Sequence, residues 1–149
     1  MGVEMDVQRP TITEVTTTAG NYGIDNTITI ELSWSEEVTV SSDTVLNLSN
    51  GATATYSSGT GGTSIIFTYT VVEDSTGSNN TSDLSVDSYT GTITDTGGNA
   101  PTSTTSVSGD LGTVIVDAQR PTVTSISATE DMYIIGESFN ITVSWSENV

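Results

Sequence analysis

The stretch Thr27-Ile-Thr-Ile-Glu-Leu-Ser-Trp-Ser35 decides the fold. Apolar residues occupy every second position in it, and the residues between them are polar or charged. Such an alternation predicts a half-buried β-strand, because successive side chains of a strand point to opposite faces of its sheet. No part of the chain shows a 3.6-residue apolar period long enough to predict a helix. The sequence therefore predicts an all-β protein.

Similar short runs occur before and after this stretch. Clusters of Gly, Asn, Ser and Asp separate them, as in the turn signal Ser49-Asn-Gly51. About seven short antiparallel strands with aromatic residues in a common core predict an immunoglobulin-like antiparallel β-sandwich. The strands are expected at 11–18, 27–35, 45–48, 52–57, 64–72, 89–94 and 112–116, with Trp34, Tyr56, Phe67 and Tyr69 packed in the core.

The chain begins a second time near its end. Residues 6–38 align with residues 117–149 without a gap, and 15 of the 33 pairs are identical. The spacing is too long for a solenoid repeat of about 20 to 50 residues and matches a whole domain. The sequence therefore predicts a complete domain over 6–116 in tandem repeat, with 117–149 as the N-terminal third of the next copy. We expect this third, the first two strands, to form an ordered or frayed hairpin or to be completed by another chain.

Composition excludes several classes of partner. The 149 residues include 19 acidic side chains and two arginines but no lysine, histidine or cysteine, so the formal net charge is −17. Binding to nucleic acid needs clustered basic residues, which argues against it, and direct contact with an anionic membrane is disfavoured for the same reason. Disulfides are impossible without cysteine. Nineteen carboxylates with so few cationic partners favour a divalent cation as the neutralising group.

The acidic residues are expected at the two ends of the sandwich, where strands of alternating direction place their loops. One end is expected to gather Asp6, Glu36 and Asp95, with Glu36 in the loop after its strand. The other end is expected to gather the loop acids, and end-to-end stacking of repeats would bring Glu147 to the junction. The candidate ligands there are Asp25, Glu73, Asp74, Asp83, Asp117 and Glu147.

These clusters predict calcium at one or both ends, since calcium accepts six to eight oxygen ligands in irregular geometry. Asp117 and its equivalent Asp6 are the preferred ligands, because an acid in a linker can serve both neighbouring domains. In the alternative interpretation the acids are solvated turn residues that keep the protein soluble.

The sequence offers no catalytic grouping. A nucleophilic Ser or Thr would have no imidazole, thiol or lysine amine beside it, since the chain contains no His, Cys or Lys. Glu36 and Glu37 are sequence neighbours, which point to opposite sides of a strand or occupy a loop, and their adjacency is no evidence for a carboxylate pair at a working separation. The chain is therefore expected not to be an enzyme.

Several short motifs follow one another in a recognisable order. They are Arg120-Pro-Thr-Val-Thr-Ser125, Ser33-Trp-Ser-Glu36, Ala52-Thr-Ala-Thr-Tyr56, Phe67-Thr-Tyr-Thr-Val71 and Asp95-Thr-Gly-Gly-Asn99. Together they resemble bacterial immunoglobulin-like tandem repeats from the extender regions of giant surface adhesins of the RTX or biofilm-associated type. The resemblance covers residues 6–149.

The resemblance implies an extracellular or cell-surface location and a role as a rigid spacer, stiffened by calcium at junctions with adjacent repeats. It places ligands among Asp117, Glu36, Glu147, Asp95 and the acids of loop 73–83. The Gly-Asp that such repeats carry before the second strand is absent, because Asp25-Asn26 and Gly136-Glu137 stand there. Two alternatives stay open: a carbohydrate- or surface-binding module, and a subunit of a surface layer or filament completed by strand exchange with a sister chain.

Overall fold

The computed structural model describes residues 5–149 and is all-β, as predicted. The chain divides into two compact units between Gln119 and Arg120. The expected boundary lies slightly earlier, but Asp117 still belongs to a strand of the first unit and Ala118 is fully buried there. Within residues 5–149 the only helical segment is a short 3-10 turn, η1 (Thr104–Val107). None of the described helical segments has the length and apolar character needed to cross a membrane.

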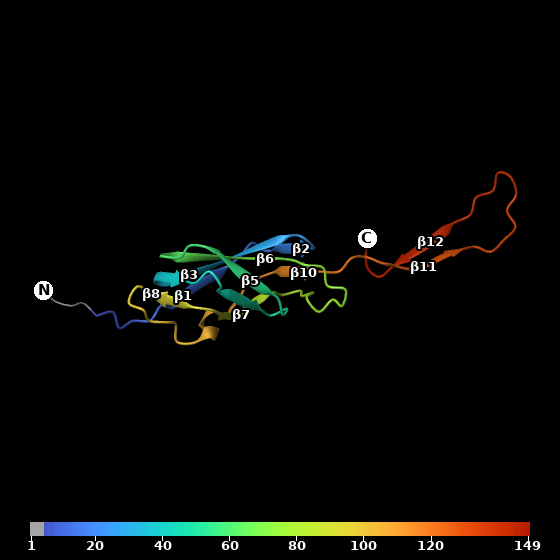
Figure 1. Cartoon of the computed structure of the whole chain (residues 1–149). Helices are drawn as coiled ribbons and strands as arrows, with labels where there is room; N and C mark the ends of the chain where they lie inside the picture. Colours follow the sequence, from blue (N-terminus) through green and yellow to red (C-terminus); the bar gives the residue numbers. More distant parts are fainter. Residues whose placement is uncertain (1–4) are drawn as a thin grey trace. The chain divides into compact units, whose positions relative to one another are not determined.

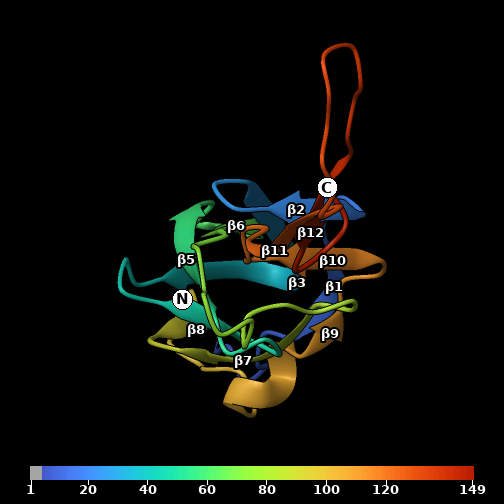
Figure 2. The same ribbon diagram turned by 90° about the vertical axis from the view of Figure 1, so that its right-hand side faces the viewer.

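The first unit is built around one long, curved antiparallel sheet (Figure 1). Its strands are joined in the order β1-β3-β6-β5-β4-β7-β9, and β8 pairs with β3. β5 and β6 lie across the core from β7 and β9, so the sheet encloses the core like a sandwich (Figure 2). The bounds are β1 Ile12–Thr16, β2 Gly20–Gly23, β3 Thr27–Val40, β4 Val45–Leu48, β5 Thr53–Ser58, β6 Gly62–Thr70, β7 Ser85–Thr90, β8 Ile93–Asp95, β9 Gly109–Asp110 and β10 Val114–Asp117.

The alternating residues of β3 supply the centre of this core. Ile28, Ile30 and Leu32 are fully buried, and Trp34 is almost so. β3 pairs along β6, which buries Ile65, Phe67 and Tyr69 on the same side of the sheet, as its alternation predicts. The predicted strand face and aromatic core are therefore confirmed.

β3 is longer than predicted, and this corrects the expected loop at Glu36. The strand continues to Val40 because Val38 and Val40 extend the same buried alternation. β6 pairs with residues 27–33 and, after a register shift, with Val38, and β8 pairs with residues 38–40. Glu36 therefore lies inside a strand, within the register shift between β3 and β6.

Two further differences concern pairings that local pattern does not reveal. The strand expected over 89–94 is two strands, β7 and β8, separated at Gly91, whose φ of 121° suits only glycine. The second is a parallel pair, β2 with β10, which forms a small sheet of its own. The sequence of Gly20–Gly23 shows no apolar alternation that would predict a strand. Its strand pairing is with β10.

The second unit consists of β11 (Val123–Ala128) and β12 (Ile141–Trp145), joined by a long loop. We call this pair the second ribbon, and β1 with residues 30–34 of β3 the first ribbon. Trp145 pairs with Val123 as Trp34 pairs with Ile12, and each ribbon has a register irregularity directly after that pair.

Side-chain hydrogen bonds are shared by the two ribbons as well. The Ser35 hydroxyl accepts the Thr11 N–H at 3.1 Å, and the Ser146 hydroxyl accepts the Thr122 N–H at 3.0 Å. The phenol groups of the two equivalent tyrosines, Tyr22 and Tyr133, each donate to a backbone carbonyl four residues earlier. The matching residues thus adopt matching local structure.

Candidate metal centre

Three carboxylates from distant parts of the sequence meet at one end of the first unit. One oxygen each of Asp6, Glu36 and Asp95 lies within 4.8 Å of the others, and this is the only such group of three within residues 5–149. Asp6 is exposed, Glu36 is half-buried and Asp95 is 3% exposed. The expected gathering of these three residues agrees with the structure, although Glu36 reaches the site from a strand.

The alternation of β3 aims Glu36 at this site. Glu36 occupies an inward position between the buried Trp34 and Val38, where an apolar residue would continue the pattern. Its neighbour Glu37 faces the other way and is exposed. Asp95 arrives beside it because β8 pairs with the end of β3 and places Asp95 opposite Val38.

Asn99 holds the Asp95 carboxylate in place. Its backbone N–H donates to Oδ1 of Asp95 at 2.7 Å, and its side-chain Nδ2 donates to Oδ2 at 2.9 Å. The same Nδ2 lies 3.3 Å from the backbone oxygen of Asp6. One amide therefore orients the buried acid and connects it to the segment that enters the domain.

Two residues that sequence reasoning did not assign to the site complete this connection. Arg9 donates from Nη1 to the carbonyl of Ala100 at 2.7 Å. Gly97 packs so closely that a Cβ there would lie 2.9 Å from the Cβ of Asp6. The two glycines of Asp95-Thr-Gly-Gly-Asn99 could have indicated a close approach of another segment. Only the fold shows that this segment contains residue 6.

The carboxylates repel one another, and this repulsion contributes to a raised pKa of Glu36. Burial, followed by the charges of Asp6 and Asp95, raises the pKa of Glu36 above its usual value. Burial also acts to raise the pKa of Asp95. The hydrogen bonds from Asn99 and from the N–H groups of Gly97 and Gly98 outweigh it, so the pKa of Asp95 is lowered. Asp95 therefore ionises more readily than an ordinary aspartate, and Glu36 ionises less readily than an ordinary glutamate.

This arrangement suits a hard divalent cation. Three carboxylates supply up to six oxygens, which are the ligands that calcium prefers, and the group contains no nitrogen or sulfur ligand. A bound cation would also remove the repulsion that raises the pKa of Glu36.

The other predicted ligands do not assemble into such a group. Asp25 is exposed in a turn with a φ of 68°, and Glu73 and Asp83 are exposed as well. Asp74 is the organiser of its own loop: it accepts hydrogen bonds from the hydroxyl and N–H of Thr76 and from the N–H of Asn79. These bonds, the Thr76 hydroxyl first, lower the pKa of Asp74.

Asp117 and Glu147 are the sequence equivalents of Asp6 and Glu36. Asp117 accepts the N–H of Gln119 at 3.1 Å, just as Asp6 accepts the N–H of Gln8 at 3.1 Å. Asp117 belongs to the first unit and Glu147 to the second, and neither is part of a group of three acids within residues 5–149.

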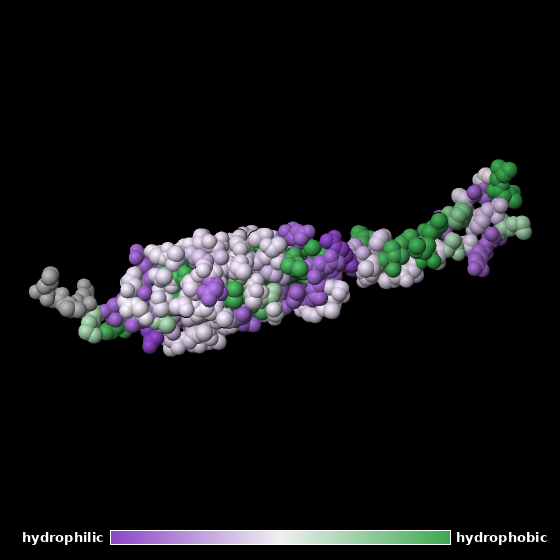
Figure 3. Space-filling model, in the orientation of Figure 1, coloured by the Kyte–Doolittle hydropathy of each residue, from purple (hydrophilic) through white to green (hydrophobic). Residues whose placement is uncertain are grey.

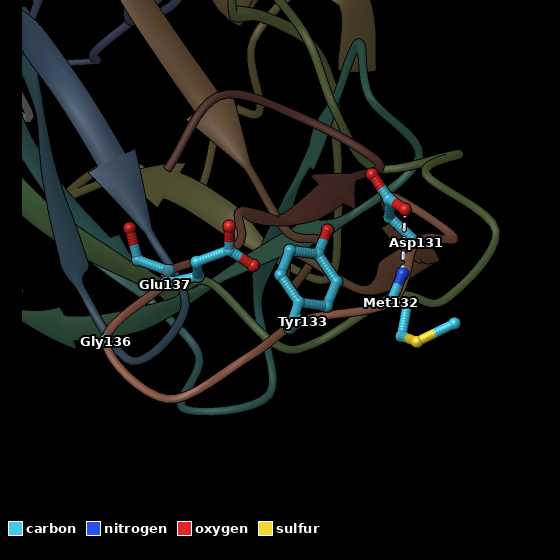
Figure 4. Close-up of a pocket in the computed structure, with 6 residues that line it drawn as sticks. Asp131, Met132, Tyr133, Gly136 and Glu137 are labelled. Carbon is cyan, nitrogen blue, oxygen red and sulfur yellow. Dashed lines mark hydrogen bonds between the residues drawn. The ribbon is translucent and has the colours of Figure 1, made fainter.

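The long loop of the second unit encloses an open hollow (Figure 4). Two hydrogen bonds lie within the loop: Met132 N–H donates to Asp131, and Ile134 N–H donates to Glu137. The Tyr133 ring also packs on Phe139, with ring centroids 5.0 Å apart. These contacts stabilise the loop around the hollow.

No family model, no curated protein and no solved structure matches this chain.

Proposed function

We propose that the chain is a structural extender segment of a large extracellular adhesin, made of immunoglobulin-like sandwiches in tandem and rigidified by calcium. The observation that carries the proposal is the meeting of Asp6, Glu36 and Asp95. Asp6 belongs to the segment that leads into β1, whereas Glu36 and Asp95 belong to β3 and β8 of the sandwich. A cation held by all three would fasten the entering segment to the domain.

The mechanical consequence follows from the positions of the ligands. Without a cation, Asp6 is exposed and is connected to the site by the Asn99 bond to its backbone oxygen, and its charge is repelled by two neighbours. With a cation, that repulsion becomes attraction, and swinging the segment away requires breaking a metal–oxygen contact. Calcium thus acts as a stiffener of the link, with Asp95 as the anchored ligand and Asp6 as the movable one.

The repeat relationship has its own support. Residues 117–149 reproduce the pairing, the register irregularity and the side-chain hydrogen bonds of residues 6–38. A spacer made of identical modules needs each module to begin with the same entry segment, and Asp-x-Gln-Arg-Pro opens both copies.

Thermal unfolding with calcium and with chelator tests the calcium site. A ligand at 100 times its Kd adds about 2.7 kcal/mol to the free energy of unfolding, so we expect calcium to raise the midpoint by several degrees. Glu36→Gln removes a charged ligand and is expected to abolish this rise. In chelator the same variant is expected to melt higher than the wild type, because the repulsion is relieved.

Glu37→Gln is the matched control, since Glu37 is the next residue of the same strand and faces solvent. It is expected to keep the full calcium response. An unchanged midpoint of the wild-type protein in calcium would rule out the stiffening role, and an equal loss of response in both variants would assign it to general charge screening.

A second candidate function, a filament or surface-layer subunit completed by strand exchange, is favoured by one observation. The second ribbon exposes an apolar face that its equivalent in the first unit buries. Sedimentation over a range of concentrations tests it: assembly that depends on Trp145 supports this role, and a strict monomer excludes it.

A further inference from the structure

The second ribbon carries a continuous apolar face. Directly paired residues of antiparallel strands lie on the same face, and the pairs Val123 with Trp145, Ile126 with Val143 and Ala128 with Ile141 are all apolar. The pairs between them, Ser125 with Ser144 and Ser127 with Thr142, are polar. Hydrophobic residues gather over this hairpin, whereas much of the first unit's visible surface is polar or neutral in hydropathy (Figure 3).

The first ribbon shows what covers such a face. Ile30, Leu32 and Trp34 are at most 4% exposed, whereas their equivalents Ile141, Val143 and Trp145 are 60%, 42% and 42% exposed. In the first unit the covering residues belong to the same hydrophobic core and come from β4, β7, η1 and β10. They include Leu46, Leu48, Val86, Val107, Val114 and Val116.

The outer edge of the ribbon also lacks its equivalent partner. β3 pairs with β1 on one side and with β6 on the other, where Ile30 lies opposite Phe67 and Leu32 opposite Ile65. β12 pairs with β11 alone among the described strands. An unpaired edge beside an apolar face is a template for strand addition.

We propose that the second ribbon is a docking site for a polypeptide with the strand chemistry of residues 39–118. That segment supplies both missing parts: a strand like β6 for the free edge of β12, and apolar residues like those of β4, β7 and β10 for the face. The proposal rests on the repeat relationship given under the proposed function and is independent of calcium.

A second copy of the whole chain fits this site less well. If its first unit accepted the second ribbon, it would have to release its own first ribbon, and the apolar area exposed to water would stay the same. Phe139 would moreover take the place of the fully buried Ile28, where a larger side chain overpacks the core. Face-to-face contact of two second ribbons would cover the apolar face but leave both β12 edges unpaired.

The test extends the full chain by a second instance of residues 39–119 placed after Val149. Amide hydrogen exchange is then followed in peptides covering β11 and β12. In the unextended chain these amides are expected to exchange rapidly, because the hairpin lacks a core. In the extended chain they are expected to slow by at least about 100-fold, as the core amides of a folded domain do.

The matched control is an extension of equal length in which Leu46→Ser, Phe67→Ser and Val86→Ser are made only in the added segment. It is expected to leave exchange in β11 and β12 fast. Equal exchange in the extended and unextended chains would overturn the proposal. Slow exchange in the unextended chain that appears with rising concentration, together with a dimer in sedimentation, would also overturn it, since a second copy would then be the occupant.

The measurements are made both in calcium and in chelator. Protection of the ribbon in chelator supports the docking site even if the calcium response of the Asp6, Glu36 and Asp95 group fails. A calcium response without protection of the ribbon would support the metal site alone.

Discussion

The first and second ribbons have nearly the same backbone pairing and opposite surroundings. Both place a tryptophan opposite the first apolar residue of the preceding strand, and both have the same register irregularity. Trp34 is nevertheless 4% exposed and Trp145 42%. The comparison separates two contributions to folding that usually occur together. Local sequence specifies the strand pairing within a ribbon, and the rest of the domain is needed to bury the apolar face of that ribbon in a core.

The same comparison explains why β2 exists. Gly20–Gly23 is a strand beside β10, whereas the equivalent residues 131–134 form no strand. The second unit contains the residues equivalent to β2, but residues 120–149 include no strand equivalent to β10. β2 is therefore specified by its partner.

The largest expected effect comes from truncating the same residue type in the two ribbons. Ile30→Ala removes a fully buried side chain and is expected to lower the free energy of unfolding of the first unit by about 2–5 kcal/mol. Ile141→Ala removes a largely exposed side chain and is expected to change it by less than about 0.5 kcal/mol. Urea unfolding followed by circular dichroism measures both. Similar losses in the two variants would show that the second ribbon is covered in solution.

A smaller effect is expected from exchanging residues between equivalent positions. Ile28→Phe gives the first ribbon the residue found at 139 and is expected to cost about 1–3 kcal/mol, because a larger ring must fit a filled core. Phe139→Ile is expected to change stability by less than about 0.5 kcal/mol. The same urea unfolding experiment applies. Tolerance of Phe at position 28 would mean that the two ribbons are interchangeable and would weaken the argument against exchange between copies.

The smallest expected effect is on pH dependence in chelator. The pKa of Glu36 is raised in the folded state, so its proton is bound more tightly there than in the unfolded chain. The destabilisation is fully present above that raised pKa and is relieved as the pH falls through it toward the usual glutamate value of about 4.3. At still lower pH, Asp95 and Asp74, whose pKa values are lowered, lose their stabilising charge.

Thermal midpoints measured at low salt between neutral and acid pH are therefore expected to rise slightly and then fall. Glu36→Gln is expected to remove the rise and keep the fall, and Glu147→Gln at the equivalent position of the second unit is the control. A rise that persists in Glu36→Gln would assign it to another carboxylate.

The candidate site was predicted in part. The expected grouping of Asp6, Glu36 and Asp95 relied on the alternation of strand directions, which sorts loops to the two ends and does not depend on exact boundaries. The local structure of Glu36 was predicted wrongly, because the polar pair Glu36-Glu37 interrupts an apolar pattern that resumes at Val38. At the opposite end, the many acidic residues do not come together in one group. Asp74 uses its oxygens for turn hydrogen bonds instead, and these bonds are common for Asp in loops.

The sequence by itself determined the strand faces and the pairing within each ribbon, since side-chain alternation and neighbouring-strand contacts depend on residues close in the chain. Only the tertiary structure decided which ribbon is buried, that Gly20–Gly23 is a strand, and that Gly97 and Asn99 fasten Asp6 to Asp95. Those outcomes depend on segments up to about ninety residues apart. Burial and carboxylate repulsion act through space, so two related stretches acquire different environments from what folds around them.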